Sequence, residues 1–147
     1  MQAMFGLEKF VRGSGLPENL VQLVKLRVSQ INGCAYCIDM HSKDLRAAGE
    51  TEQRLYLLDA WREAPFYSER ERAAFAWAEA LTLVREGHVP DEEFEQARSR
   101  FSEQELVNLS LAVVAINSWN RFSIAFRAVP GSYQPPQHRE APANPAV

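Results

Sequence analysis

Residues 23–44 read LVKLRVSQINGCAYCIDMHSKD, and this stretch contains the signals that decide the fold. Apolar residues recur at helical spacing on both sides of Asn32-Gly33, a dipeptide typical of a break between two elements. We therefore predict one helix from Pro17 to about Ser29 and a second that begins at or near Cys34 and is stopped by Gly49. The second helix has a face formed by Cys34, Cys37, Ile38, His41, Leu45 and Ala48.

The rest of the chain also favours helices, because no segment shows sustained period-two alternation or a hairpin signal. Thr51 is the predicted N-cap of a third helix, which carries Leu55, Leu58 and Trp61 and ends before Pro65.

Two capping-box signatures, Ser68-x-x-Glu71 and Ser102-x-x-Glu105, predict the starts of the two longest helices. The first is expected to close at Gly87, and a short segment at 90–100 bridges to the second, which runs to about Phe126. That last helix is apolar on most of its circumference, which is typical of a helix that is central or lies at a subunit contact.

These patterns predict an all-α, single-domain helical bundle over residues 15–129. Residues 1–14 are interpreted as an N-terminal lead-in segment. Residues 130–147 hold five of the eight prolines and little that could pack, so we expect an extended or disordered Pro-rich tail.

Length, charge and hydropathy exclude several classes of function. The chain has 147 residues, suited to one domain, and a formal net charge of -3 with both signs interspersed, which argues against nucleic-acid or anionic-membrane partners. It shows neither a secretory leader nor an apolar run long enough to span a membrane. We expect a cytoplasmic protein, where a structural disulfide would be unusual.

The two cysteines of the chain form a C-x-x-C pair, Cys34 and Cys37, followed four residues later by His41. A cysteine in the first turn of a helix is expected to have a lowered pKa, because unpaired backbone N–H groups favour the thiolate. His41 neighbours Cys37 at i+4 and can take its proton. The pattern predicts a thiol that a peroxide oxidises to sulfenic acid, a second thiol that condenses with it to a disulfide, and an external dithiol that resets the pair.

Other interpretations stay open at this point. Cys34, Cys37 and His41 could bind zinc, although no nearby fourth ligand is evident. Haem attachment needs His directly after the second Cys, an iron-sulfur cluster needs more cysteines, and a thioredoxin-like motif needs neighbouring strands. A redox-sensing or metal-binding helical module without enzyme activity is the rival class, and zinc analysis distinguishes its metal-binding form.

Residues 23–44 resemble the alkylhydroperoxidase D-like branch of the carboxymuconolactone decarboxylase superfamily, and the segment Ile116-Asn117-Ser118-Trp119-Asn120-Arg121 with Pro130-Gly131 is similar to a C-terminal pattern of one subgroup. The resemblance covers roughly residues 15–133. It implies a helical homo-oligomer, a trimer or hexamer, with peroxiredoxin-type antioxidant activity. By the same resemblance Cys37 attacks the hydroperoxide, Cys34 resolves it, His41 belongs to the proton relay, and a dihydrolipoyl-type dithiol is the electron donor, with no bound cofactor or metal.

Two positions depart from the family pattern. The relay of the family includes a Glu twelve residues before the first motif Cys, and here that residue is Gln22, whose amide cannot accept a proton. Glu18, one turn earlier, is a candidate to replace the relay Glu. If no residue replaces it, the peroxidase activity is expected to be weaker. Tyr36 stands where the best-studied members have a His. Dithiol-disulfide exchange is the alternative reaction, and lactone decarboxylation ranks below both because decarboxylases of the superfamily lack the C-x-x-C pair.

Overall fold

The computed structural model describes residues 1–136, and the elements in this part of the chain are all helical. Its elements are α1 (Gln2–Arg12), α2 (Glu18–Asn32), α3 (Ala35–Ala47), α4 (Glu52–Tyr56), the 3-10 turn η1 (Leu58–Ala60), α5 (Glu69–Thr82), α6 (Val84–Gly87), α7 (Asp91–Arg100) and α8 (Glu103–Ala125). The prediction of an all-α chain is confirmed for these residues.

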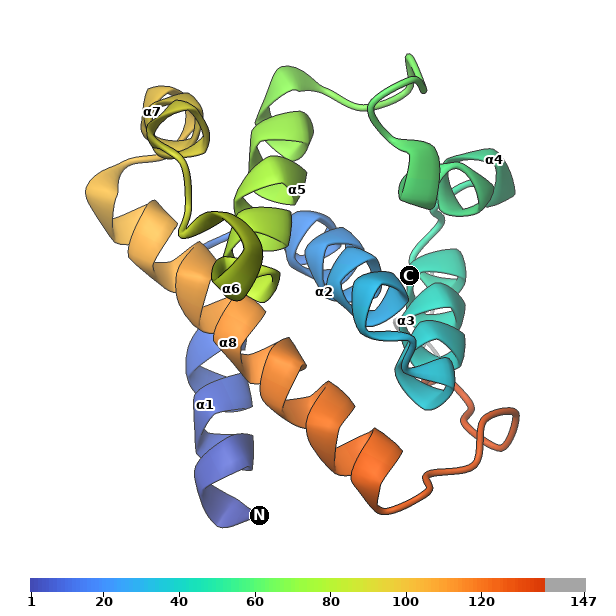
Figure 1. Cartoon of the computed structure of the whole chain (residues 1–147). Helices are drawn as coiled ribbons and strands as arrows, with labels where there is room; N and C mark the ends of the chain where they lie inside the picture. Colours follow the sequence, from blue (N-terminus) through green and yellow to red (C-terminus); the bar gives the residue numbers. More distant parts are fainter. Residues whose placement is uncertain (137–147) are drawn as a thin grey trace, which may run out of the picture.

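Helix α2 is the centre of the arrangement. It contacts α3, α5 and α8, and Figure 1 shows it in the middle of the molecule with α8 running along one side. Leu23, Val24 and Val28 are fully buried, so the apolar residues that predicted this helix also place it in the core. The predicted break follows α2 directly: Gly33 adopts a left-handed conformation with φ 67°, which favours glycine.

Most predicted helix starts are confirmed by side-chain caps. Cys34 is the N-cap of α3, and Thr51 caps α4 by accepting a hydrogen bond from the backbone N–H of Arg54. Ser68 and Ser102 both form complete capping boxes, each with the Glu three residues later. Local sequence chemistry therefore sets where these helices begin.

The predicted third helix is wrong in its length. It ends at Tyr56, and η1 follows, so that Leu58 and Trp61 reach the core while Tyr56 stays exposed. The guanidinium of Arg72 donates hydrogen bonds to three backbone carbonyls of this connection, those of residues 61, 62 and 64. This distant side chain satisfies groups that a longer helix would have paired internally.

The two ends of the described chain differ from the expected lead-in and tail. Residues 2–12 form α1, which packs against α8 with the ring centroids of Phe5 and Trp119 5.6 Å apart. Residues 130–136 have no regular structure, as expected, yet they are hydrogen-bonded to α3. The remainder of the predicted tail, residues 137–147, lies outside the described residues.

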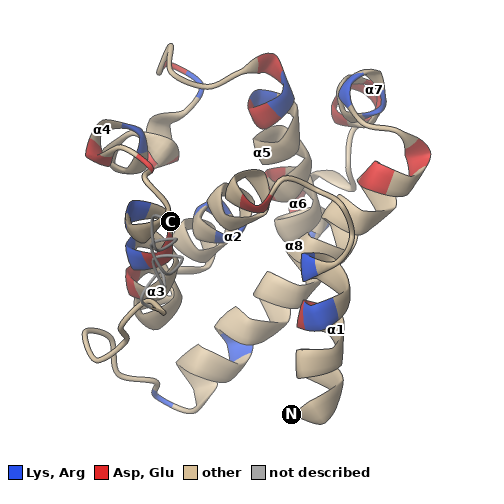
Figure 2. Cartoon of the chain, turned by 180° about the vertical axis from the view of Figure 1, so that it is seen from behind, with Lys and Arg blue, Asp and Glu red and all other residues tan. Residues whose placement is uncertain are grey.

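Helix α8 borders the core on one side only. Its buried face includes Leu109 and Ile116, whereas Val107, Val114 and Phe122 are exposed on the other. Figure 2 shows that the charged residues gather on the other helices and that the C-terminal half of α8 has few of them. Over residues 1–136, no helix combines the length and the apolar character that crossing a membrane requires.

Candidate thiol site

The two thiols lie together at the start of α3. The Sγ atoms of Cys34 and Cys37 are 2.6 Å apart, both cysteines are free, and both are buried. The backbone holds them there, because Cys34 is the N-cap and its Sγ accepts a hydrogen bond from the Cys37 N–H at 3.4 Å. A disulfide could form between them with little movement of the backbone.

A cavity of about 350 Å³ opens beside the pair, and Cys37 is on its wall. Cys34 does not line this cavity, so the second thiol lies behind the first. The lining comes from α1, α2, α3, α8 and the C-terminal segment: Phe5, Glu8, Arg12, Gln22, Lys25, Tyr36, Cys37, Met40, His41, Asp44, Ile116, Trp119, Ser123 and Tyr133. A reactant that enters the cavity therefore meets Cys37 and not Cys34.

The thiol of Cys37 is held in its protonated form. Burial, followed by the contact with Cys34, raises the pKa of Cys37 from 9.0 to about 11. Contacts with Ser123 and Asn120 lower this pKa but do not outweigh the burial. The pKa of Cys37 is therefore not lowered, as was expected for the first helical turn, but raised by burial.

Helix α8 supplies two polar neighbours of Cys37 that sequence reasoning missed as site residues. The Oγ of Ser123 lies 3.6 Å from the Cys37 Sγ. Asn120 is fully buried, donates to the Ser29 Oγ and accepts from the Asn32 side chain, which ties α8 to the C-terminal end of α2 just before the thiols. Only the polar character of Asn120 in an apolar helix gave a signal; nothing in the sequence distinguished Ser123.

His41 and Gln22 form the predicted pair. The His41 Nδ1 and the Gln22 Oε1 are 2.7 Å apart, and an amide oxygen can only accept, so this contact places the imidazole proton on Nδ1. The lone pair is then on Nε2, which is buried and has no hydrogen-bond partner among residues 1–136. Burial, and next the positive charge of Lys25, lowers the pKa of His41 to about 3. His41 is thus a neutral imidazole whose Nε2 has an unshared lone pair but is less basic than that of an exposed histidine.

The substitute carboxylate proposed from the sequence, Glu18, is not in the site. It is exposed at the first turn of α2 and does not line the thiol cavity. It borders a much smaller neighbouring cavity that shares Glu8, Arg12, Gln22 and Lys25 with the thiol cavity. The thiol cavity is instead lined by Glu8 from α1. The Oε2 of Glu8 is 2.5 Å from the Lys25 Nζ, and its Oε1 accepts a hydrogen bond from the Trp119 Nε1 at 3.1 Å. Glu8 was missed because α1 was interpreted as a lead-in segment.

Tyr36 completes the predicted set. It is half-buried and lines the cavity beside Cys37. The structure therefore brings Cys37, His41, Gln22 and Tyr36 to one cavity, with Cys34 behind its wall. Within residues 1–136 no group of three or more His, Cys, Asp or Glu side chains is arranged to hold a metal ion.

Comparison with known proteins identifies the family and the relatives to which the sequence is similar. Residues 1–80 match the carboxymuconolactone decarboxylase family. The uncharacterized protein YdfG of Bacillus subtilis (strain 168) is 48% identical over 125 residues, which cover 85% of each chain.

Two solved structures are also similar to this chain. A protein of unknown function from Agrobacterium tumefaciens, proposed to be the antioxidant defence protein AhpD, shares 44% identity over 90% of both chains with a TM-score of 0.86. An uncharacterized peroxidase-related protein from Ralstonia eutropha JMP134, described as an alkylhydroperoxidase AhpD core, has a TM-score of 0.78 at 18% identity, covering 89% of this chain and 70% of its own. At that identity the second similarity establishes the fold alone.

Proposed function

Because the chain belongs to the carboxymuconolactone decarboxylase family, in its alkylhydroperoxidase D-like branch, we propose that it is a thiol-dependent antioxidant enzyme that reduces hydroperoxides. Cys37 is the attacking thiol, Cys34 the resolving thiol and His41 the acid and base. The observation that carries this proposal is the asymmetry of the pair: two thiols are within disulfide reach, and only one faces the cavity.

The first step is the attack on the peroxide. His41 takes the Cys37 proton at Nε2, directly or through a water, and the thiolate attacks the terminal oxygen of ROOH. The S–O bond forms, the O–O bond breaks, and the alkoxide leaves as ROH with the proton from His41. Because the pKa of Cys37 is raised and that of His41 is lowered, proton transfer between them is the demanding part of this step.

The second step forms the disulfide. The Cys34 thiol attacks the sulfur of the Cys37 sulfenic acid, the S–S bond forms, and water leaves with the thiol proton. An external dithiol then reduces the disulfide by two successive exchanges and is itself oxidised. The sum is ROOH and a dithiol converted to ROH, water and a disulfide.

Burial of both cysteines limits what the electron donor can be. Neither sulfur is on the outer surface, so a dithiol must reach Cys37 through the cavity. A slender dithiol on a flexible arm, of the dihydrolipoyl type, fits this requirement better than a cysteine pair on a folded protein surface. The free thiols also suit a reducing compartment such as the cytoplasm.

A homo-oligomer is part of the proposal. Val107, Val114 and Phe122 expose apolar surface along one side of α8, and such surface on a helix is commonly covered by another subunit. The trimer or hexamer of the family is the expected state. Light scattering on the Val114→Asp variant, compared with the native chain, tests whether this face holds subunits together.

The direct test of the function is a single-turnover experiment. Reduced, metal-free protein is mixed with one equivalent of an organic hydroperoxide, and the cysteines are mapped by mass spectrometry over time. We expect rapid formation of the Cys34–Cys37 disulfide. Cys37→Ser should prevent peroxide consumption, whereas Cys34→Ser should still consume one equivalent and accumulate the sulfenic acid on Cys37.

Two outcomes would contradict the assignment of Cys37 as a peroxide-reducing thiol. A fully active Cys37→Ser variant would exclude Cys37 as the nucleophile. Oxidation of the native protein no faster than that of free cysteine would exclude a peroxidase and favour dithiol-disulfide exchange, which the amide at Gln22 makes the second candidate.

A further inference from the structure

The chain after α8 returns to the thiol cavity. Two residues with positive φ, Arg127 at 59° and Gly131 at 97°, redirect the backbone after the helix. Figure 1 shows this segment passing from the end of α8 to the side of α3. We refer to residues 128–136 as the C-terminal strap.

The strap is fastened to α3 by side chains of that helix. The Gly131 N–H donates to the Asp39 Oδ2 at 3.0 Å, and the Lys43 ammonium donates to the Tyr133 carbonyl at 3.0 Å and to the Gly131 carbonyl at 3.3 Å. Asp39 and Lys43 are also paired with each other at 2.9 Å. Neither Asp39 nor Lys43 lines the thiol cavity, so these contacts fix the strap without contributing to the cavity wall.

Tyr133 is the strap residue that lines the cavity. Its phenol donates to the Asp44 Oδ1 at 2.7 Å, which fixes the half-buried side chain at the cavity that also contains Cys37. Phe5, Tyr36 and Trp119 are the other aromatic lining residues. Ligand cavities span about 300–1,000 Å³, so the 350 Å³ enclosed here is near the lower end of the range.

We propose that Tyr133 is a specificity-determining residue of this site: the strap holds its side chain as one wall of the cavity, and this wall admits compact reactants to Cys37 while excluding bulky ones. The inference rests on the proposed function in taking Cys37 as the reacting thiol. A hydroperoxide with a body of about one ring fits a cavity of this volume, whereas we expect a polycyclic or branched body to be obstructed by Tyr133.

The test uses alkylation, which needs no peroxidase activity. Cys37 of the reduced full-length protein is labelled with iodoacetamide or with the bulkier N-(1-pyrenyl)maleimide, and peptide mapping gives the rate for each. In Tyr133→Ala the rate ratio of bulky to small reagent should rise by about tenfold or more, as expected when a pocket wall is removed. Tyr133→Phe keeps the ring and should shift this ratio far less.

Two further variants complete the design. Asp39→Ala loosens the strap from outside the cavity and should shift the ratio in the same direction as Tyr133→Ala. Tyr56→Ala, an exposed tyrosine on α4, is the matched control and should leave the ratio unchanged. An unchanged ratio in both Tyr133→Ala and Asp39→Ala, or an equal acceleration of both reagents, overturns the proposal. Because peroxide turnover is not measured, failure of the peroxidase assignment remains a separate result.

Discussion

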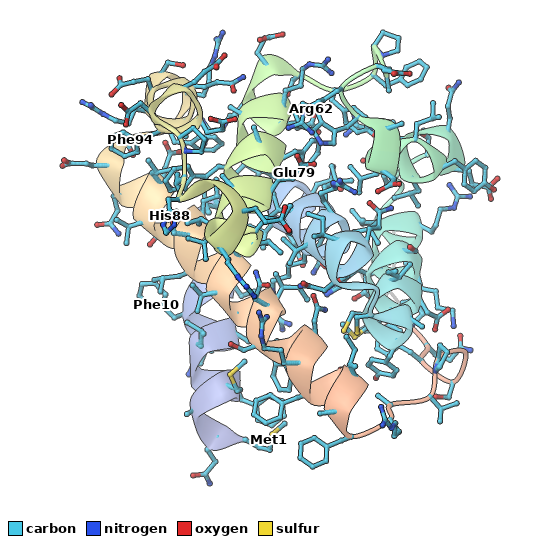
Figure 3. All side chains as sticks on the ribbon, viewed as in Figure 1. Met1, Phe10, Arg62, Glu79, His88 and Phe94 are labelled. Atoms are coloured by element: carbon cyan, nitrogen blue, oxygen red, sulfur yellow. The ribbon has the colours of Figure 1, made fainter. Side chains whose placement is uncertain are left out.

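Two polar clusters on α2 can be compared directly, one around Gln22 and one around Arg27. At Arg27, the carboxylate of Glu79 accepts from the Arg27 Nε at 2.8 Å, the Trp61 Nε1 at 2.8 Å and the Arg62 Nη1 at 2.6 Å. Figure 3 shows Arg62 and Glu79 close together between α5 and the connection that precedes it. At Gln22, the partner His41 keeps one ring nitrogen without a protein partner among residues 1–136.

The pKa shifts of the two clusters favour opposite charge states. Burial alone would raise the pKa of Glu79, but the hydrogen bonds from Trp61, Arg27 and Arg62 outweigh it and the pKa is lowered, so the charged form is favoured. At the thiol site burial prevails, and both His41 and Cys37 favour their neutral forms. The first cluster is a satisfied structural ion pair, and the second holds a buried neutral thiol and a buried neutral imidazole, the groups to which we assign the chemistry.

The largest effect is expected from removing the proposed base. His41→Asn should lower kcat/KM for hydroperoxide by about 100- to 10,000-fold, the range attributed to general acid-base catalysis. Stopped-flow measurement of Cys37 oxidation checks this value, with urea unfolding as the control for folding. An unchanged oxidation rate would mean that Nε2 of His41 does not take the Cys37 proton.

The matching change in the structural cluster should affect stability. Glu79→Gln removes the carboxylate partner of Arg27 on α5 but leaves the ion pair with Asp59, so we expect a loss of about 1–3 kcal/mol of unfolding free energy. The rate of Cys37 alkylation in the folded variant should be unchanged. Equilibrium unfolding in urea measures the free energy of unfolding. A stability equal to that of the native chain would contradict the structural role.

The pH dependence of thiol reactivity comes next in magnitude. Because the pKa of Cys37 is raised to about 11, alkylation of Cys37 should accelerate about tenfold per pH unit through the neutral and mildly alkaline range, without a plateau near the usual thiol pKa of 9.0. Iodoacetamide labelling across this range, compared with labelling of the unfolded chain, checks the prediction. A plateau below pH 9.0 in the folded protein would show that the thiolate is stabilised instead.

Restoring the carboxylate of the family relay should have the smallest effect. Gln22→Glu places a negative charge beside the His41 Nδ1, which should raise the pKa of His41 and make it a stronger base. We expect the rate of Cys37 oxidation to increase by up to about tenfold, because only part of a gain in basicity appears in the rate of proton transfer. A gain of several orders of magnitude would instead show that the natural site lacks an effective base.

Much of this protein could be predicted from local sequence. The break at Gly33, the caps at Cys34, Thr51, Ser68 and Ser102, and the apolar face of α2 specify the helices because each signal acts within a few residues. The C-x-x-C spacing likewise fixes the two thiols within reach of each other. These features do not depend on how the helices pack.

Packing decided the rest of the site. Only the tertiary structure placed Glu8 of α1, Ser123 of α8 and Tyr133 of the strap around Cys37, because these residues are separated from it in sequence and carry no motif. Packing also raised the pKa of Cys37, which the sequence predicted to be lowered, since this pKa depends on how much water the neighbouring helices remove. The sequence by itself determined which groups could react, whereas burial determined their protonation and which of the two thiols a reactant meets.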